Sequence, residues 1–238
     1  MQNILAHAGI ASRREAAKII ENGEVKVDGK VVLERGFRAD ISINKIEVNG
    51  KLIHGDQKKY HFLFYKPENV ISTVKDTQDR RKIVDFFADV KARLYPVGRL
   101  DRNTTGLIIV TNDGDLTNKL THPRYEIDKE YMVLAEEKLD EKMRLTLEAG
   151  IFLEDKKTSP AIIEFLKEEK NGYRYKVEIH EGQNRQIRRM FEEMSIRVRK
   201  LKRTKYAFLT LKGLKKGQYR KLTREEVERL RSICDGRS

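Results

Sequence analysis

The sequence predicts an α+β protein with a small N-terminal domain and a larger domain built on a mixed, mostly antiparallel sheet. Three observations support this prediction. Residues 1–53 hold closely spaced helix-capping and tight-turn signals, residues 54–60 are polar and contain glycine, and residues 61–238 hold many short apolar runs with few helical patterns. Strands that are mostly not separated by helices are typical of an α+β fold. We therefore expect domains at 1–53 and 61–238, with a linker at 54–60.

The N-terminal segment combines two short helices with a small hairpin sheet. Ser12 and Glu15 have the spacing of a capping box, and the apolar-periodic stretch behind them ends at Gly23, which suits a helix C-terminus. An Asp-Gly pair at 28–29 and an Asn-Gly pair at 49–50 each follow a short alternating strand and predict tight turns. Basic side chains surround the helix and the first hairpin: Arg13, Arg14, Lys18, Lys26 and Lys30.

The larger segment alternates between strand and helix signals. Strands are predicted at 61–65, 94–97, 106–111, 131–135, 161–166, 173–179 and 197–206. Helices are predicted at 83–87, 115–121, 141–149, 185–194 and 225–233, the last behind a capping box of Thr223 and Glu226. There is no internal repeat and no low-complexity stretch.

The charge balance favours a polyanionic partner. Lys and Arg number 50 against 37 Asp and Glu, which gives a net charge of +13. Phosphate contacts release counterions, so such an excess suits a nucleic acid, although charge alone does not separate RNA from DNA or from an anionic membrane. The chain has no apolar run near the roughly 18 residues of a membrane span and no secretory signal pattern, so we expect a cytoplasmic protein.

Several chemistries lack their usual motifs. The sequence has no phosphate-binding P-loop and no G-x-G-x-x-G after a strand, so no nucleotide cofactor is expected. It also has no nucleophile-elbow motif, which disfavours Ser-His-Asp catalysis. The single cysteine, Cys234, cannot form an internal disulfide or a Cys-rich zinc site, and no His/Cys/Asp cluster has metal-ligand spacing. The five scattered histidines are read as ordinary polar residues: His7, His54, His61, His122 and His180. We therefore predict neither a cofactor nor a metal.

One loop carries a carboxylate in a position that suits catalysis. Asp101 lies between two apolar strands and is flanked by Arg99 and Arg102. Loops held by a rigid scaffold are common places for catalytic groups. An isolated Arg-Leu-Asp sequence, however, is more often a surface salt bridge, so the longer motif has to decide.

That longer motif, residues 98–114, resembles the signature of the bacterial pseudouridine synthases that modify small- or large-subunit ribosomal RNA. Lys66-Pro67 matches the first motif of this family. Residues 129–133 match the segment with its active-site tyrosine, and residues 181–191 match the motif with its active-site arginine. Order and spacing agree over roughly residues 2–212, and the B class of the large-subunit enzymes is the nearest match.

The resemblance implies a catalytic domain with a central cleft and an enzyme that converts a specific uridine of 23S ribosomal RNA to pseudouridine. It implies Asp101 as nucleophile, Arg188 as its ion-pair partner and Tyr131 as the residue that stacks on the extruded base. Burial alone would neutralise a carboxylate, and a fixed arginine reverses that effect. Because the reaction rearranges one nucleotide, no cofactor or metal is needed. Ile187 is expected to wall the pocket, although a plain helix-core role is equally consistent with its sequence position.

A second resemblance concerns RNA binding. Parts of residues 4–29 are similar to the S-four-type RNA-binding domain, which implies that the helix with Arg13, Arg14 and Lys18 docks on structured RNA. In the larger domain, the predicted substrate or RNA contacts are Lys66, Arg99, Arg102, Ile187, Arg189 and Lys202. The basic stretch 185–205, which also contains Arg197, Arg199 and Lys205, is expected at the mouth of the cleft, with a solvated strand face as the alternative.

Three positions depart from the family pattern: Asn69 and Ser195 replace common glycines, and Arg185 replaces a common histidine. Asn tolerates the left-handed region, so little effect is expected at position 69. Two other functions stay open at this point: a non-catalytic assembly factor that binds ribosomal RNA, and an enzyme whose target is 16S RNA. A membrane-surface role is disfavoured because no basic amphipathic helix with bulky apolar residues is present. We expect a monomer.

Overall fold

The computed structural model describes residues 1–53, 57–154 and 156–236, so the first three residues of the predicted linker lie outside the described part. The chain divides into two compact units. The first comprises residues 1–60 with the short stretches 91–93 and 112–114, and the second comprises the remaining residues.

The first unit packs two helices on a small antiparallel sheet. Its helices are α1 (Gln2–His7) and α2 (Arg13–Glu21). Its strands, in the spatial order β2-β1-β3-β4, are β1 (Val25–Val27), β2 (Lys30–Val31), β3 (Ile46–Val48) and β4 (Lys51–Leu52). The fully buried core joins Leu5 and Ile20 of the helices to Val25 and Ile46 of the strands.

The local signals of this unit are confirmed. The Glu15 amide donates to Ser12 Oγ at 3.2 Å, and the Ser12 amide donates to a Glu15 carboxylate oxygen at 2.9 Å, which completes the predicted capping box. Both predicted turns have the left-handed backbone that such hairpins need, with φ near 50° at the Asp or Asn and 73–80° at the glycine that follows.

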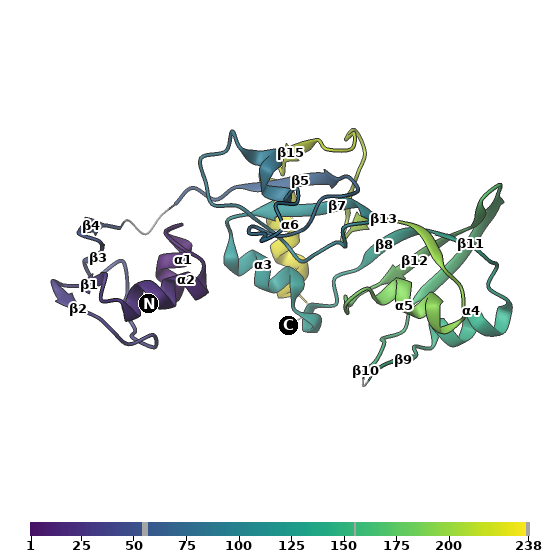
Figure 1. Ribbon diagram of the computed structural model, residues 1–238, viewed down its shortest axis with the longest axis horizontal. Helices are drawn as coiled ribbons and strands as arrows, with labels where there is room; N and C mark the ends of the chain where they lie inside the picture. Colours follow the sequence, from purple (N-terminus) through teal and green to yellow (C-terminus); the bar gives the residue numbers. More distant parts are fainter. Residues whose placement is uncertain (54–56, 155, 237–238) are drawn as a thin grey trace. The chain divides into compact units, whose positions relative to one another are not determined.

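The second unit is built on one large sheet. The spatial order of its main path is β11-β12-β8-β13-β7-β5-β15, with β14 beside β13 and β6 beside β7 (Figure 1). Its strands are β5 (His61–Lys66), β6 (Tyr95–Pro96), β7 (Thr104–Thr111), β8 (Lys129–Ala135), β11 (Ile162–Glu169), β12 (Gly172–Ile179), β13 (Val198–Tyr206), β14 (Leu209–Thr210) and β15 (Tyr219–Lys221). Of the strand pairs described in this sheet, β7 with β13 is parallel and the others are antiparallel, which confirms the predicted fold class.

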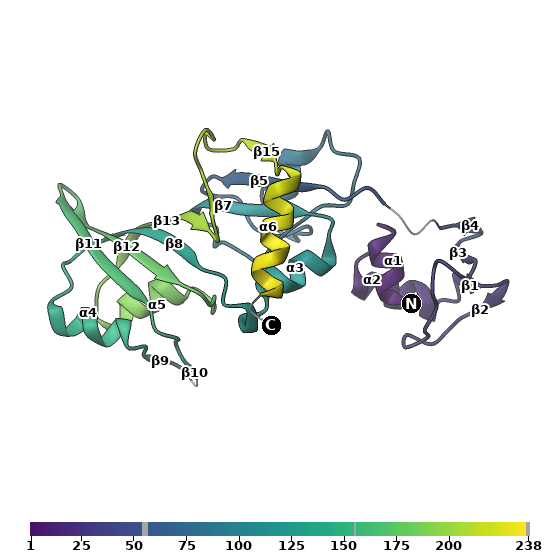
Figure 2. The same cartoon turned by 180° about the vertical axis from the view of Figure 1, so that it is seen from behind.

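Helices cover the two halves of this sheet separately (Figures 1 and 2). They are η1 (Ile83–Phe87), α3 (Gly114–Thr121), η2 (Pro123–Tyr125), α4 (Glu141–Glu148), α5 (Gln186–Glu193) and α6 (Arg224–Asp235). Leu116 of α3 and Leu230 of α6 share a buried core with Leu63 of β5 and Ile109 of β7, whereas α4 and α5 contact strands of the other half. The helix predicted at 83–87 is a 3₁₀ helix, and the capping box of α6 is confirmed.

Several short elements lie outside the predicted pattern. The hairpin of β9 (Phe152–Leu153) and β10 (Lys156–Lys157) precedes β11, and β14 and β15 are only two or three residues long. The strand β6 is also short, but it falls within the strand predicted at 94–97. Asn69 has a φ of 62°, as expected from its place in the motif. Over the ranges given above, no helix has both the length and the hydropathy that crossing a bilayer requires.

Candidate active site

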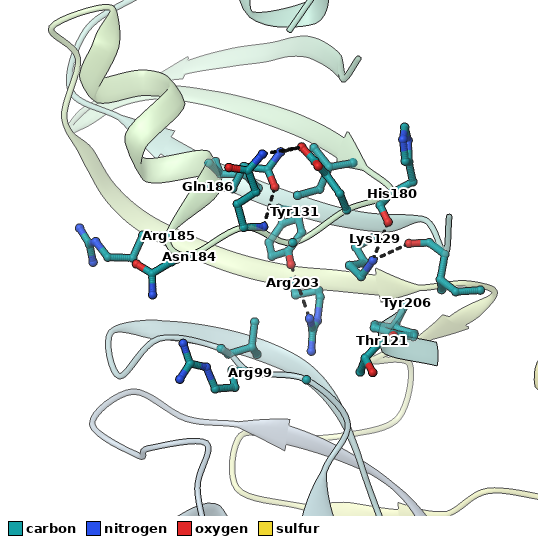
Figure 3. Close-up of a pocket in the computed structure, with 18 of the residues that line it drawn as sticks. Arg99, Thr121, Lys129, Tyr131, His180, Asn184, Arg185, Gln186, Arg203 and Tyr206 are labelled. Carbon is teal, nitrogen blue, oxygen red and sulfur yellow. Dashed lines mark hydrogen bonds between the residues drawn. The ribbon is translucent and has the colours of Figure 1, made fainter. Parts of the chain in front are cut away.

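A cavity of about 420 Å³ lies in the second unit, where the loop before β7 meets β8, β13 and the start of α5 (Figure 3). The loop contributes Arg99 and Asp101, β8 contributes Lys129 and Tyr131, and β13 contributes Leu201 and Arg203. The segment from His180 to Ile187 closes another wall. The volume of the cavity lies in the range of sites that hold small molecules.

Asp101, which lines this cavity, lies next to Arg188. Arg188 Nε is 3.9 Å from Asp101 Oδ2, and the exposed fractions of the two side chains are 9% and 32%. Arg188 is held independently, because one amino group donates to the Val198 carbonyl at 2.8 Å and the other to the Asn103 carbonyl at 3.4 Å. Burial lowers the pKa of Arg188 from its ordinary value, and Asp101 opposes this effect. The distance describes an ion pair without a direct Nε hydrogen bond.

Lys66 stabilises the Asp101 loop through hydrogen bonds to its backbone. Its side chain is completely buried, and its ammonium group donates to the carbonyl oxygens of Thr104 at 2.8 Å and Asp101 at 3.1 Å, with Pro67 and Arg102 completing the cage. Burial lowers the pKa of Lys66 to about 8. The predicted contact of Lys66 with RNA does not fit this arrangement, because the ammonium group faces backbone carbonyls and not solvent.

Tyr131, Lys129 and Arg203 form the wall opposite the loop. The guanidinium of Arg203 donates to the Leu107 carbonyl at 2.7 Å and to the Tyr131 hydroxyl oxygen at 3.5 Å. Figure 3 shows Tyr131 and Arg203 pointing toward one another. Lys129 donates to the carbonyls of Ile127 and His180 at 2.7 and 2.9 Å.

The start of α5 contributes an apolar contact and a buried polar network. Ile187 lines the cavity and is 3% exposed, so its predicted wall position and its helix-core alternative coincide. Buried Glu181 accepts from the Gln186 side chain at 2.7 Å and from the Ser159 amide at 2.8 Å. Arg185, the residue before α5, has a left-handed φ of 50° and lines the same cavity.

The predicted RNA-contacting residues of this unit are not all at the cavity. Arg99 is exposed and lines it, whereas Arg102 is exposed outside the lining set. Arg189 pairs with Glu154 at 3.2 Å. Lys202 is not among the lining residues, unlike its neighbours Leu201 and Arg203 on β13, and its contact with RNA stays a prediction. Its ammonium group lies over Tyr65 instead, 5.0 Å from the ring centre.

In the first unit, the predicted docking helix has the expected surface. Arg13, Arg14 and Lys18 are exposed on α2, while Ala16 and Ile20 face the core. The three cations therefore share the solvent side of one short helix.

The cavity residues that the sequence reasoning did not single out include Lys129, Glu181, Gln186 and Arg203. Strand parity could have identified Lys129, since residues two apart on a strand share a face and Tyr131 was already assigned to the site. The same signal is weaker for Arg203, because the pairing of β13 with β8 is irregular between Arg203 and Lys205.

Burial of Lys129 predicts a pH-dependent contribution to stability. Burial lowers its pKa to about 8 in the folded protein, from an ordinary value of 10.5. Between these two pKa values the unfolded chain binds more protons than the folded protein, so the free energy of unfolding rises with pH. Below about pH 8 the full cost of burying the charged Lys129 ammonium group lowers the stability. Lys129→Met is expected to remove the contribution of Lys129 to this rise, which amounts to at most about 3 kcal/mol.

Urea unfolding of both proteins on either side of this pH window measures the difference. Lys200→Met is the control, because Lys200 is an exposed lysine of β13 outside the cavity lining. Equal pH slopes for wild type and Lys129→Met would contradict the assignment. Lys66 also has a lowered pKa, so part of the rise is expected to persist in the variant.

Comparison with known proteins adds independent information. Residues 60–193 match the family model described as RNA pseudouridylate synthase, and residues 2–42 match the S4 domain. The chain is 47% identical over 237 residues to the ribosomal large subunit pseudouridine synthase B of Bacillus subtilis, covering 99% of this chain and 96% of the relative. It is 36% identical over 242 residues to the protein of the same name from Salmonella typhimurium, covering 99% and 83%. A crystal structure of a pseudouridylate synthase superposes with a TM-score of 0.68 at 28% identity, covering 96% of this chain and 98% of the other.

Proposed function

Because the chain belongs to the RNA pseudouridylate synthase family, we propose that it isomerises a specific uridine of ribosomal RNA to pseudouridine, with Asp101, Tyr131 and Arg188 around the reacting base. The observation that carries these roles is a single cavity lined by the carboxylate of Asp101 and the phenol of Tyr131, with the guanidinium of Arg188 beside that carboxylate. None of the three lies on the same element as another: Asp101 is in a loop, Tyr131 on β8 and Arg188 on α5.

The reaction balances within one nucleotide. The bond from uracil N1 to ribose C1′ breaks, a bond from C5 to C1′ forms, C5 loses a proton and N1 gains one. No electrons or atoms enter from outside. Asp101 is the nucleophile, at either C1′ or C6, and the guanidinium of Arg188 lies beside its carboxylate. Tyr131 stacks on the uracil and its hydroxyl relays the C5 proton.

The target base has to leave its stack to reach Asp101. Enzymes that act on a base within structured nucleic acid extrude it into a pocket, at a cost of a few kcal/mol. In the proposed complex, Arg99 at the cavity contacts the backbone of the extruded nucleotide. Ile187 supplies an apolar contact to the uracil, as its position in the cavity wall suggests.

The ribosomal large subunit is the proposed source of the substrate. Two full-length relatives are named for it, and the S4 match supports docking of the first unit on structured RNA. We further propose 23S RNA as the modified molecule, a monomeric enzyme and a cytoplasmic location. The domain boundaries at 53 and 61 are part of this proposal, with docking by the first segment and chemistry by the second.

A map of pseudouridines in ribosomal RNA from cells with and without this protein tests the proposal. Loss of one site in 23S RNA is the expected result, and purified protein should restore it on a transcript. Loss of a site in 16S RNA would move the target to the small subunit. Unchanged maps, with RNA binding retained, would favour an assembly factor.

Removing the cations of α2 should weaken RNA binding without changing the chemistry. Arg13→Ala, Arg14→Ala and Lys18→Ala together remove up to three phosphate contacts, each of which contributes roughly 0.7–0.9 to the slope of log affinity against log salt. We expect this negative slope to become shallower by about 2–3, and the rate of pseudouridine formation at saturating protein to stay unchanged. Binding titrations at several salt concentrations measure both quantities.

A matched control changes three exposed lysines of the second unit to alanine: Lys212, Lys215 and Lys216. It removes the same net charge from another surface. An equal fall in slope for both triple variants would assign the effect to net charge and not to docking by α2.

A further inference from the structure

Arg203 is a buried cation at the cavity. It lies on β13, is 3% exposed and belongs to the lining of the cavity. Among the described residues it has no carboxylate partner within ion-pair distance, and its second amino group has no hydrogen-bond partner there. Of the two carboxylates that line the cavity, Asp101 pairs with Arg188 instead, and Glu181 accepts from the Gln186 side chain and the Ser159 amide.

Burial of such a guanidinium, taken by itself, lowers the stability of the fold. Removing an ion from water costs several kcal/mol unless partners compensate for it. The compensation here is one carbonyl, one phenol oxygen and the ring of Tyr206, whose centre is 5.1 Å from the guanidinium carbon. A cation–π contact contributes only about 0.5–2 kcal/mol. An apolar side chain would fill this place at lower cost, which indicates that the charge serves the site.

The neighbouring strand β7 fixes the place of Arg203. Gly106 is registered with Arg203 in the parallel pair, and a Cβ added to Gly106 would lie 2.2 Å from the Arg203 carbonyl oxygen. Gly106 also has a φ of 119°, which favours glycine. One residue further along β7, the Leu107 carbonyl accepts from Arg203 Nε. Backbone and side chain of Arg203 are thus both located by β7.

The contact with Tyr131 has a defined direction. Arginine can only donate hydrogen bonds, so the Tyr131 oxygen accepts from Arg203 Nη1. The hydroxyl hydrogen of Tyr131 is then not directed at Arg203 and can be directed into the cavity. The distance of 3.5 Å is at the long end for a hydrogen bond, and such contacts in free enzymes tighten when substrate binds.

We propose that Arg203 is a positioning residue, which holds the Tyr131 hydroxyl in the orientation that the uracil requires. This inference rests on the proposed function, because it assigns to Arg203 an effect on the reaction that is exerted through Tyr131. Arg203 itself need not touch the RNA. The competing explanation is a purely structural cation whose loss would disturb the whole cavity.

A double-mutant cycle separates the two explanations. The rate of pseudouridine formation is measured with protein in excess over the RNA, for wild type, Arg203→Met, Tyr131→Phe and the double variant. A positioning group misplaced by about 1 Å can cost roughly 100-fold in rate, and this is the loss expected for Arg203→Met. In the Tyr131→Phe background, where the hydroxyl is absent, Arg203→Met should cost less than about 3-fold. Equal losses in both backgrounds would overturn the proposal.

Two further measurements keep the test decisive if Tyr131→Phe is too slow or Arg203→Met folds poorly. Arg203→Lys retains a charged donor, so it should recover part of the rate, and a rate no better than that of a folded Arg203→Met counts against positioning. With deuterium at C5 of the target uridine, Arg203→Met, or Arg203→Lys in its place, should show a larger isotope effect than wild type. An isotope effect equal to that of wild type would overturn the proposal.

The control is Lys221→Met, which removes an exposed cation of β15 outside both the cavity lining and the basic stretch 185–205, and which should keep the wild-type rate. RNA affinity and thermal unfolding are measured in parallel, and affinity should change less than about 3-fold for Arg203→Met. If wild-type protein itself forms no pseudouridine, the proposed function fails. If wild type is active and the two substitutions are additive, only the role of Arg203 fails.

Discussion

Replacement of Asp101 by asparagine is expected to abolish pseudouridine formation while the protein stays folded and binds RNA. Asparagine has nearly the same shape, so the loop should keep its geometry, but it has no charge and is a poor nucleophile. Loss of a nucleophile lowers enzymatic rates by roughly 10⁴-fold or more. Because the Asp101 side chain is 32% exposed and makes only a 3.9 Å contact with Arg188, little stability should be lost.

Chemical labelling of pseudouridine in a ribosomal RNA transcript, read by reverse transcription, measures the product, and a binding titration measures RNA affinity. Asp79→Asn is a matched control, because Asp79 is exposed outside the cavity lining and its left-handed φ of 50° suits asparagine. It should behave as wild type. Wild-type activity of the D101N protein would falsify the assignment of the nucleophile.

Lys66→Met is expected to have the second-largest effect, and to affect stability and activity together. The ammonium group donates to the carbonyl oxygens of Asp101, Arg102 and Thr104, where the Asp101 loop enters β7, and to that of Pro67, which follows β5. A methionine of similar length leaves these acceptors without that donor. Each buried acceptor that loses its partner costs about 1–3 kcal/mol, so we expect a loss of about 2–4 kcal/mol in the free energy of unfolding.

Activity should fall further than unfolding explains, because a loop without its cage no longer holds Asp101 against Arg188. Urea unfolding and the rate with excess protein, at a temperature where the variant is folded, measure the two effects. Lys221→Met is the control, since Lys221 is an exposed lysine of β15 that pairs with β5. A variant that is less stable but reacts at the wild-type rate would show that Asp101 does not depend on the cage.

Local signals in the sequence predicted local structure well. The capping boxes at Ser12 and Thr223 and the two glycine turns of the first unit depend on neighbouring residues, so they are confirmed at the predicted positions. The mostly antiparallel sheet followed from many strands with few helices between them. The short strands β14 and β15 were missed because two or three residues have no measurable period.

The site was predictable only in part, for a related reason. Asp101, Tyr131 and Arg188 were proposed from motif resemblance; the structure brings the first two to one cavity and Arg188 beside Asp101, and their roles stay a proposal. Lys66 and Arg203 are different, because a lysine or arginine in a sequence is normally read as a surface charge. Only tertiary contacts, the carbonyl cage for one and the contact with Tyr131 for the other, distinguish them from solvated cations.

The order of the strands has a consequence for how the molecule is made. The first unit draws its core mainly from consecutive residues, so it can form soon after they leave the translating ribosome. In the second unit, β5 pairs with β15, and β7 and β8 both pair with β13, so strands near the two ends of its sequence have to meet. Such long loops slow folding. A nascent chain should therefore acquire its RNA-docking part well before its catalytic cavity exists.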